Sequence, residues 1–252
     1  MTITHSPRPL AVALTLLSAL PIHAALVQAQ ESEFALEEVV VTARRRVENL
    51  QDVPIAVTAL NRDDLDLRGS FDIAEIAQEI PSVTLEPSRA TNTTLTAFIR
   101  GVGQQDPLAG FEQGVALYLD DVYLARPQGA LLDIYDVERI EVLRGPQGTL
   151  YGRNAVGGAI KYVTRRLSDE PELRLRARVG TYDQTDLIAT ASMPFGDTFR
   201  VGATVASLQR DGFGDNKTTG DDNYNKDLLA YRVSAEFLPS ESLLIRFAYD
   251  DL

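Results

Sequence analysis

Residues 173–179 read Leu-Arg-Leu-Arg-Ala-Arg-Val, a strict alternation of apolar and charged side chains. A period of two is typical of a β-strand with one apolar and one polar face. The same alternation recurs at residues 187–195, 199–205, 231–237 and 243–249. The C-terminal third of the chain, residues 172–252, is therefore predicted to form five antiparallel strands of about ten residues each.

The connections between these strands narrow the choice of fold. Residues 196–198 and 239–242 are short turns, whereas residues 211–227 form a long polar loop. Alternating short and long connections, with charges kept on one face, favour the wall of an outer-membrane β-barrel. A soluble β-sandwich also alternates and is the alternative.

The N-terminal 29 residues have the features of a secretory signal peptide. A basic start precedes an apolar run at residues 10–20, which Pro21 ends. The small residues Val27 and Ala29 favour cleavage after Ala29. No later stretch reaches the about 20 apolar residues of a spanning helix, so we expect any membrane crossing to use strands.

The composition excludes several kinds of chemistry. The 252 residues carry a net charge of −12, no cysteine and no tryptophan. The two histidines, His5 and His23, both lie in the predicted signal peptide. A mature chain without His or Cys has no Ser-His-Asp or Cys-His catalysis and no zinc site of the usual kind. We therefore predict no enzyme, no catalytic or metal site and no cofactor, and the acidic balance argues against nucleic acid as a partner.

Residues 47–166 mix short strand and helix patterns and are predicted to form a small α+β domain. Asn61 begins a helix that ends at Gly69, and a second helix with an apolar face ends at Pro81. The expected strands are Pro54–Leu60, Leu95–Arg100, Val115–Leu124, Arg139–Arg144 and Ala159–Thr164. Within the third of these, Asp120-Asp121 is expected to make a tight hairpin turn.

Glycines are concentrated at one place in this domain. Five of the 17 glycines fall within residues 145–158, namely Gly145, Gly148, Gly152, Gly157 and Gly158. This density predicts tight turns, or backbone pressed against another surface. A phosphate-binding loop is disfavoured because Gly158 stands where that motif requires lysine.

Around these glycines the sequence is similar to a known family. Residues 137–165, reading VERIEVLRGPQGTLYGRNAVGGAIKYVTR, together with residues 98–103 and 118–124, resemble the plug domain of TonB-dependent outer-membrane receptors. Residues 51–58 resemble the start of that plug, and residues 37–43 resemble its TonB box.

The resemblance implies a domain organisation and a location. The chain would comprise a signal peptide at 1–29, an N-terminal segment with the TonB box at 30–46, an α+β plug domain at 47–166 and the first transmembrane β-barrel strands at 172–252. We expect the protein in the cell outer membrane, in contact with lipid. Five strands do not close a barrel, because bacterial barrels have at least eight. The sequence is therefore interpreted as a fragment of a longer receptor, or as a truncated gene product that does not transport.

The resemblance also implies a function and partners. It suggests energy-coupled uptake of a scarce nutrient, most often a ferric siderophore, with vitamin B12, haem, sugars and aromatic compounds as alternatives. The partner TonB would bind by strand addition to an exposed segment made of Glu38, Val39, Val40, Val41 and Thr42. A disordered linker, or a plug that only takes part in protein interactions, are the other interpretations.

Two further groups of site residues follow from the resemblance. The residues expected to pack the plug are Arg100, Gly101, Arg144, Gly145, Gly148, Gly152, Arg153, Gly157 and Gly158, and the three arginines among them are expected to pair with carboxylates of the barrel wall. The residues expected to face a ligand, in the apex loops at 103–111 and 126–129, are Gln104, Gln105 and Asp106.

Overall fold

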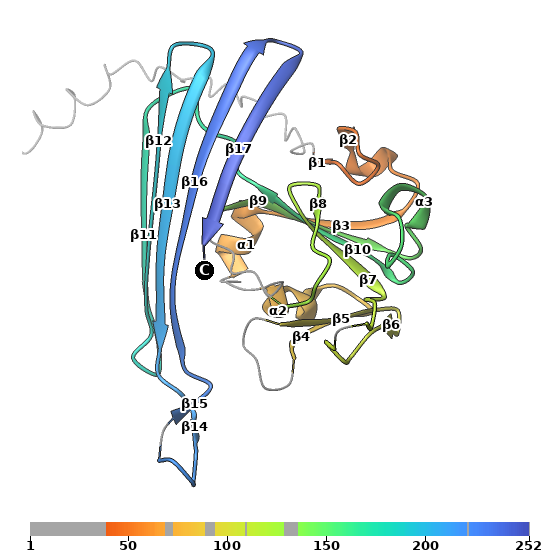
Figure 1. Cartoon of the computed structure of the whole chain (residues 1–252), viewed down its shortest axis with the longest axis vertical. Helices are drawn as coiled ribbons and strands as arrows, with labels where there is room; N and C mark the ends of the chain where they lie inside the picture. The colour runs from red at the N-terminus through yellow and green to blue at the C-terminus, as the bar shows by residue number, and fades with distance from the viewer. Residues whose placement is uncertain are drawn as a thin grey trace, which may run out of the picture. The chain divides into compact units, whose positions relative to one another are not determined.

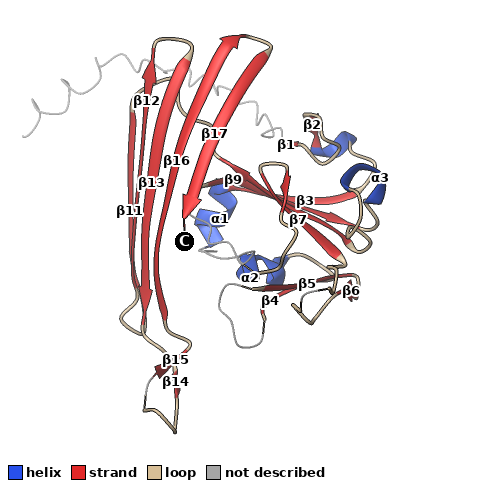
Figure 2. Cartoon of the chain, viewed as in Figure 1, coloured by secondary structure: helices blue, strands red, loops and turns tan. Residues whose placement is uncertain are grey.

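The computed structural model describes residues 39–68, 73–88, 94–108, 110–128, 136–220 and 222–251. The predicted signal peptide, and Glu38 of the predicted TonB contact, lie outside these residues. The described elements comprise a mixed α+β part followed by long antiparallel strands, as predicted (Figures 1 and 2). Among the described residues, no helix is both long enough and apolar enough to cross a membrane.

A five-stranded mixed sheet forms the centre of the α+β part. Its order is β3-β9-β10-β7-β8, and its strands are β3 (Ala56–Asn61), β9 (Val137–Arg144), β10 (Gly158–Thr164), β7 (Val115–Leu119) and β8 (Val122–Tyr123). Strands β10 and β7 are parallel, whereas the other neighbours are antiparallel. The single strand expected at Val115–Leu124 is in fact two strands. Asp120 and Asp121 separate them with positive φ values of 46° and 68°, as the expected hairpin turn requires.

One face of this sheet carries the larger apolar core. It packs against α1 (Arg62–Arg68), α2 (Ile73–Ile76), the 3₁₀ turn η2 (Ala77–Glu79) and a small sheet of β4 (Val83–Pro87), β5 (Leu95–Ile99) and β6 (Val102–Gly103). The predicted cap of α1 is present, because Asn61 Oδ1 accepts a hydrogen bond from the Asp64 amide at 2.7 Å. Strand β4 was not predicted.

The opposite face is covered by the start of the described chain. Strands β1 (Val40–Val41) and β2 (Glu48–Asn49), the 3₁₀ turn η1 (Leu50–Asp52) and α3 (Gly148–Tyr151) lie on this side. A second apolar cluster joins them to the sheet; its buried members are Val41, Ala43, Val53, Ala116, Tyr118, Leu143, Tyr151, Ala155 and Ala159.

The five alternating stretches form one antiparallel sheet, here called the wall. Its strands, in order, are β11 (Glu172–Val179), β12 (Thr185–Phe195), β13 (Phe199–Arg210), β16 (Lys226–Ser240) and β17 (Leu243–Asp251). The long polar loop between β13 and β16 contains a small hairpin of β14 (Gly214–Asp215) and β15 (Asp222–Asn223). All five predicted wall strands are confirmed.

The two faces of the wall are inverted relative to a water-soluble sheet. Apolar side chains such as Leu175 and Val179 are 72% and 82% exposed, whereas Thr204 and Glu236 on the other face are 2% and 0% exposed. An apolar face turned outward and a polar face turned inward is the arrangement of a lipid-facing barrel wall.

A short linker joins β10 to β11 and is held by its first three residues. The linker, residues 165–171, places the Arg165 guanidinium beside Asp136 at 3.7 Å and beside Glu172. Arg166 Nε donates to Glu236 Oε1 of β16 at 2.8 Å, and Leu167 is buried. The linker therefore runs along the polar face of the wall.

Candidate functional site

The segment 39–50, which contains most of the predicted TonB contact, lies docked on the five-stranded sheet of the α+β part, the predicted plug. Val40 and Val41 pair with Asn49 and Glu48 in the β1–β2 hairpin. Val41 and Ala43 are 0% exposed, whereas Val40 lies at the surface, at 38%. The prediction that residues 38–42 form an exposed segment is therefore wrong for Val41, because its side chain fills the second apolar cluster.

Two buried charges hold Thr42 at the centre of this site. Lys161 and Glu141 face each other across β10 and β9, and their side chains are 1% and 0% exposed. Lys161 Nζ donates to Thr42 O at 3.0 Å and to Thr42 Oγ1 at 2.8 Å. Glu141 Oε1 accepts from the Thr42 amide at 2.8 Å and from Oγ1 at 3.1 Å. Every polar group of Thr42 is thus engaged by the plug, and we call this arrangement the Thr42 clasp.

Neighbouring charges balance the clasp. Arg139 Nε donates to Glu141 Oε1 at 2.8 Å, and Asp121 Oδ1 lies 3.0 Å from Lys161 Nζ. A buried charge is tolerated only when it is paired and hydrogen-bonded. Lys161 meets that condition, and Glu141 meets it through Oε1, whereas its Oε2 makes no hydrogen bond and lies 4.0 Å from Lys161 Nζ.

Two tyrosines close the clasp from the side of α3. Tyr151 donates to Ala43 O at 2.8 Å, and Tyr118 donates to Tyr151 O at 2.6 Å. Burial raises the pKa of Tyr151 strongly, and the nearby carboxylate of Glu141 adds to the rise. Both hydroxyls therefore stay protonated as hydrogen-bond donors at neutral pH.

A second set of charges fixes the hairpin itself. Arg44 forms a bidentate pair with Glu48, and Arg46 Nη2 lies 2.8 Å from Glu48 Oε1. Hydrogen bonds from both arginines lower the pKa of Glu48 to about 2. The carboxylate therefore remains ionised in all but strongly acidic solution.

The glycines that the resemblance assigns to plug packing differ in what surrounds them. A Cβ at Gly157 would lie 2.8 Å from Val102 O, and a Cβ at Gly158 would collide with Leu143 O. Gly101, Gly145 and Gly152 have positive φ values of 78°, 113° and 77°, a backbone conformation that glycine adopts without the strain other residues would suffer. A Cβ added at Gly101, Gly148 or Gly152 would meet nothing within 4 Å among the described residues, so the packing role of these three glycines stays a prediction.

The expected pairing of Arg100, Arg144 and Arg153 with carboxylates of the barrel wall stays a prediction, and two of these arginines have other partners among the described residues. Arg153 Nη1 pairs with Glu112 Oε1 at 2.6 Å, and Arg144 Nη1 lies 3.5 Å from Pro81 O. Both partners belong to the plug. Arg100 packs its guanidinium against Gly145, where an added Cβ would lie 3.1 Å from Nη1.

Where the plug contacts the wall, carboxylates of the plug pair with arginines of the wall. Arg232 of β16, only 4% exposed, lies 3.2 Å from Asp120 and 4.0 Å from Asp136. Arg246 of β17 lies 3.6 Å from Asp120 and donates to Arg165 O at 2.6 Å. We call these residues the wall cluster.

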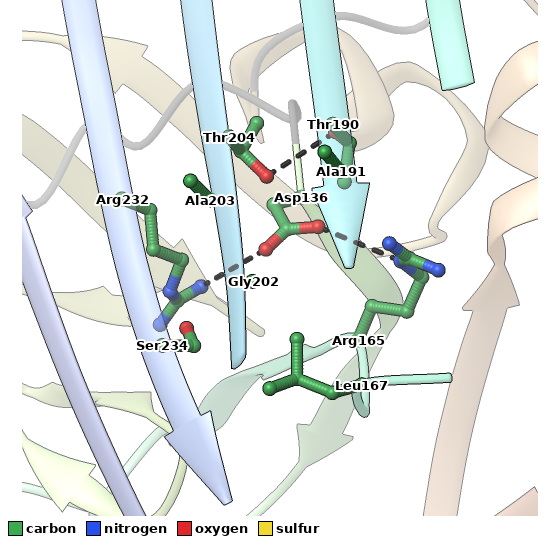
Figure 3. A pocket seen from close by; sticks show the side chains of 10 residues that line it. All are labelled: Asp136, Arg165, Leu167, Thr190, Ala191, Gly202, Ala203, Thr204, Arg232 and Ser234. Atoms are coloured by element: carbon green, nitrogen blue, oxygen red, sulfur yellow. Dashed lines mark hydrogen bonds and ion pairs between the residues drawn. The ribbon is translucent and has the colours of Figure 1, made fainter. Parts of the chain in front are cut away.

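A small cavity lies beside the wall cluster (Figure 3). Its volume is about 10 Å³, and Asp136, Arg232 and Thr204 are among the residues that line it. That space suits about one water molecule, and the lining supplies polar partners for one. Burial raises the pKa of Asp136, although Arg232 and Arg165 act in the opposite direction.

The two predicted apex loops contact each other. Gln128 Nε2 donates to Pro107 O at 2.6 Å, which joins residues 126–128 to the loop 103–108. Gln104 Oε1 accepts from the Asp106 amide at 3.1 Å, and Gln105 and Asp106 are exposed. Their role toward a ligand stays a prediction.

Sequence reasoning missed Glu141, Lys161 and the wall cluster. A signal was present for Lys161, which is the one charged residue of an otherwise mostly apolar strand and one of only three lysines in the chain. Glu141 gave no such signal, because its strand carries three other charged residues. Arg232 and Arg246 gave no signal, because every wall strand carries such charges.

Comparison with known proteins agrees with this architecture. Residues 49–159 match the family model described as the TonB-dependent receptor plug domain. Over this stretch the chain is similar to the plug domain of TonB-dependent receptors. The iron-regulated outer membrane virulence protein of Vibrio cholerae is 32% identical over 146 residues, which are 55% of this chain and 21% of that protein.

Solved structures extend the likeness to the wall that follows the plug. The ferric yersiniabactin uptake receptor of Yersinia pestis superposes with a TM-score of 0.69 and 26% identity, over 77% of this chain and 30% of that one. The alcaligin receptor of Bordetella pertussis, at 16% identity and a TM-score of 0.64 over 84% of this chain and 34% of that one, shows the same fold.

These relatives bear on three sequence predictions. The chain spans about a fifth of the curated relatives' length. The relatives are outer-membrane receptors and not enzymes, in agreement with the predicted family, location and non-enzymatic role.

Proposed function

We propose that the chain provides the plug and five wall strands of a TonB-dependent receptor that takes up a ferric siderophore across the outer membrane. The observation that carries the proposal is the plug match at residues 49–159, followed by a wall with its apolar face outward. The siderophore class is supported by the relatives, whose names refer to iron-regulated expression and to uptake of ferric yersiniabactin.

The partner on the periplasmic side is proposed to be TonB, which would pair with the backbone of residues 38–42 by strand addition. In the docked segment, the amide and carbonyl of Thr42 are bound to Glu141 and Lys161. Strand addition therefore requires the segment to leave the clasp first. The apparent affinity for the partner is reduced by the fraction of molecules that are undocked.

The test compares Val40→Pro with Val40→Thr in cells that express the receptor. Proline removes a backbone donor and fixes φ, whereas threonine keeps the donor and the β-branched shape. Uptake of ⁵⁵Fe-loaded siderophores, and capture by the purified periplasmic domain of TonB, are measured for both.

We expect Val40→Pro to lose uptake and TonB capture while still binding ferric siderophore at the cell surface, and Val40→Thr to keep all three. Full uptake by Val40→Pro would refute strand addition at this segment. Failure of the unaltered receptor to bind any member of a panel of ferric catecholates, hydroxamates and phenolates would refute the cargo class.

A further inference from the structure

The Asp120–Asp121 turn lies between the two charged sites described above. It joins β7 to β8, and both residues have left-handed backbone conformations, which are uncommon for residues other than glycine. The Asp120 amide donates to Tyr162 O at 2.9 Å, so the turn packs against the end of β10. This is the strand that carries Lys161.

Each aspartate of the turn serves a different site. Asp121 Oδ1 lies 3.0 Å from Lys161 Nζ, the group that binds Thr42 O. Asp120 Oδ2 lies 3.2 Å from Arg232 Nη2 and 3.6 Å from Arg246 Nη1, both on the wall.

Asp120 is also fixed to β10. Its carboxylate accepts from the Thr164 amide at 2.8 Å and from Thr164 Oγ1 at 2.5 Å. Asp120 and Asp121 share one peptide plane, and a two-residue turn has few alternative conformations. A shift of the turn that weakens the contact of Asp121 with Lys161 must therefore also move Asp120 relative to Arg232.

We propose that the Asp120–Asp121 turn couples the docking of segment 39–50 to the contact between plug and wall. When the segment leaves the Thr42 clasp, Lys161 loses two acceptors, and its pairing with Asp121 changes. The turn then repositions Asp120 against Arg232 and Arg246. Such coupling is reciprocal, so loosening the wall contact must also favour release of the segment. This coupling rests on the proposed function only for the identity of the partner, TonB, that pulls the segment out of the clasp.

The test uses the absence of cysteine from the 252 residues. A single Val41→Cys substitution places a thiol at a fully buried position of the docked segment. Its rate of reaction with a maleimide fluorophore, measured on the receptor in outer-membrane preparations without TonB or siderophore, reports how often the segment undocks.

Asp120→Asn is the decisive variant. Asparagine tolerates the left-handed conformation and still accepts from the Thr164 amide, while the charge facing Arg232 is removed. We expect Asp121→Asn to raise the labelling rate by at most about fivefold by acting directly on Lys161, because the Asp121 carboxylate is largely exposed. Asp120→Asn is expected to raise it about threefold through the turn. Asp197→Asn, which removes a charge from the exposed β12–β13 turn, is the matched control and should leave the rate unchanged.

A second variant acts from the wall alone. Arg232→Gln alters no plug residue and is expected to raise labelling as Asp120→Asn does, which keeps the test decisive if Asp120→Asn does not fold. Labelling of Asp120→Asn or Arg232→Gln at the rate of the Asp197→Asn control would overturn the coupling. Because no TonB or siderophore is present, that result would leave the Val40→Pro outcome untouched.

Discussion

Replacing Lys161 with methionine tests the Thr42 clasp most directly. Methionine keeps the length of the side chain, but it loses the two hydrogen bonds to Thr42, at 3.0 and 2.8 Å. Hydrogen bonds from a charged donor contribute about 1.5–3 kcal/mol each. The pairing with Asp121 is left out of this sum, because that carboxylate is 57% exposed and such a pair contributes at most about 1 kcal/mol.

The docked segment is therefore expected to lose about 3 kcal/mol, the lower end of that sum, which raises its frequency of opening about 100-fold. The stability of the plug as a whole is expected to change much less. Methionine avoids the cost of burying an ammonium group, and Glu141 keeps its pair with Arg139.

Hydrogen exchange followed by mass spectrometry measures this opening on peptides that cover residues 39–50. Lys217→Met makes the same substitution at an exposed lysine of the long loop and serves as the control. If Lys161→Met changed the exchange of this segment by less than about threefold relative to that control, the clasp would contribute too little to hold the segment, and the reasoning would fail.

Two further substitutions test the plug. Gly157→Ala forces a Cβ to within 2.8 Å of Val102 O and is expected to cost about 1–3 kcal/mol, measured as a lower thermal midpoint. Gly148→Ala, at a helical position with nothing within 4 Å, is its control and should not lower that midpoint. The pKa of Glu48 is lowered from 4.5 to about 2, so its contribution is present above pH 4.5 and is lost as the pH falls toward 2. Protection of residues 39–50 against hydrogen exchange should decline across that pH range in the unaltered protein but not in Glu48→Gln. Equal declines in the two proteins would count against the pairing.

Local pattern was sufficient to predict the wall. Alternation of side chains is fixed by strand geometry alone, so each stretch from Leu173 to Tyr249 was recognised as a strand. The strands extend beyond the alternating residues, as β16 does in beginning at Lys226. Backbone pairing continues there although the consecutive apolar residues Leu228, Leu229 and Ala230 break the alternation from which the strand was recognised.

The docking of segment 39–50 could not be predicted from the local sequence pattern. A β-branched run at residues 39–42 has the same appearance whether it is free or covered. What covers Val41 and Thr42 comes from residues about 100 or more positions away, such as Glu141 and Lys161. The turn at Asp120-Asp121 was recognisable from its residues, but its two different partners were not.

The linker sets a limit on how far the plug can travel. Seven residues, 165–171, separate the last strand of the plug from the first strand of the wall. Fully stretched, they reach at most about 24 Å, which is close to the about 25 Å height of the apolar band of such barrels. The anchoring of Arg165 and Arg166 shortens that tether further. If the α+β part sits inside a closed barrel, as the proposed function requires, the end of β10 can therefore move no farther from the start of β11 than about the height of that band.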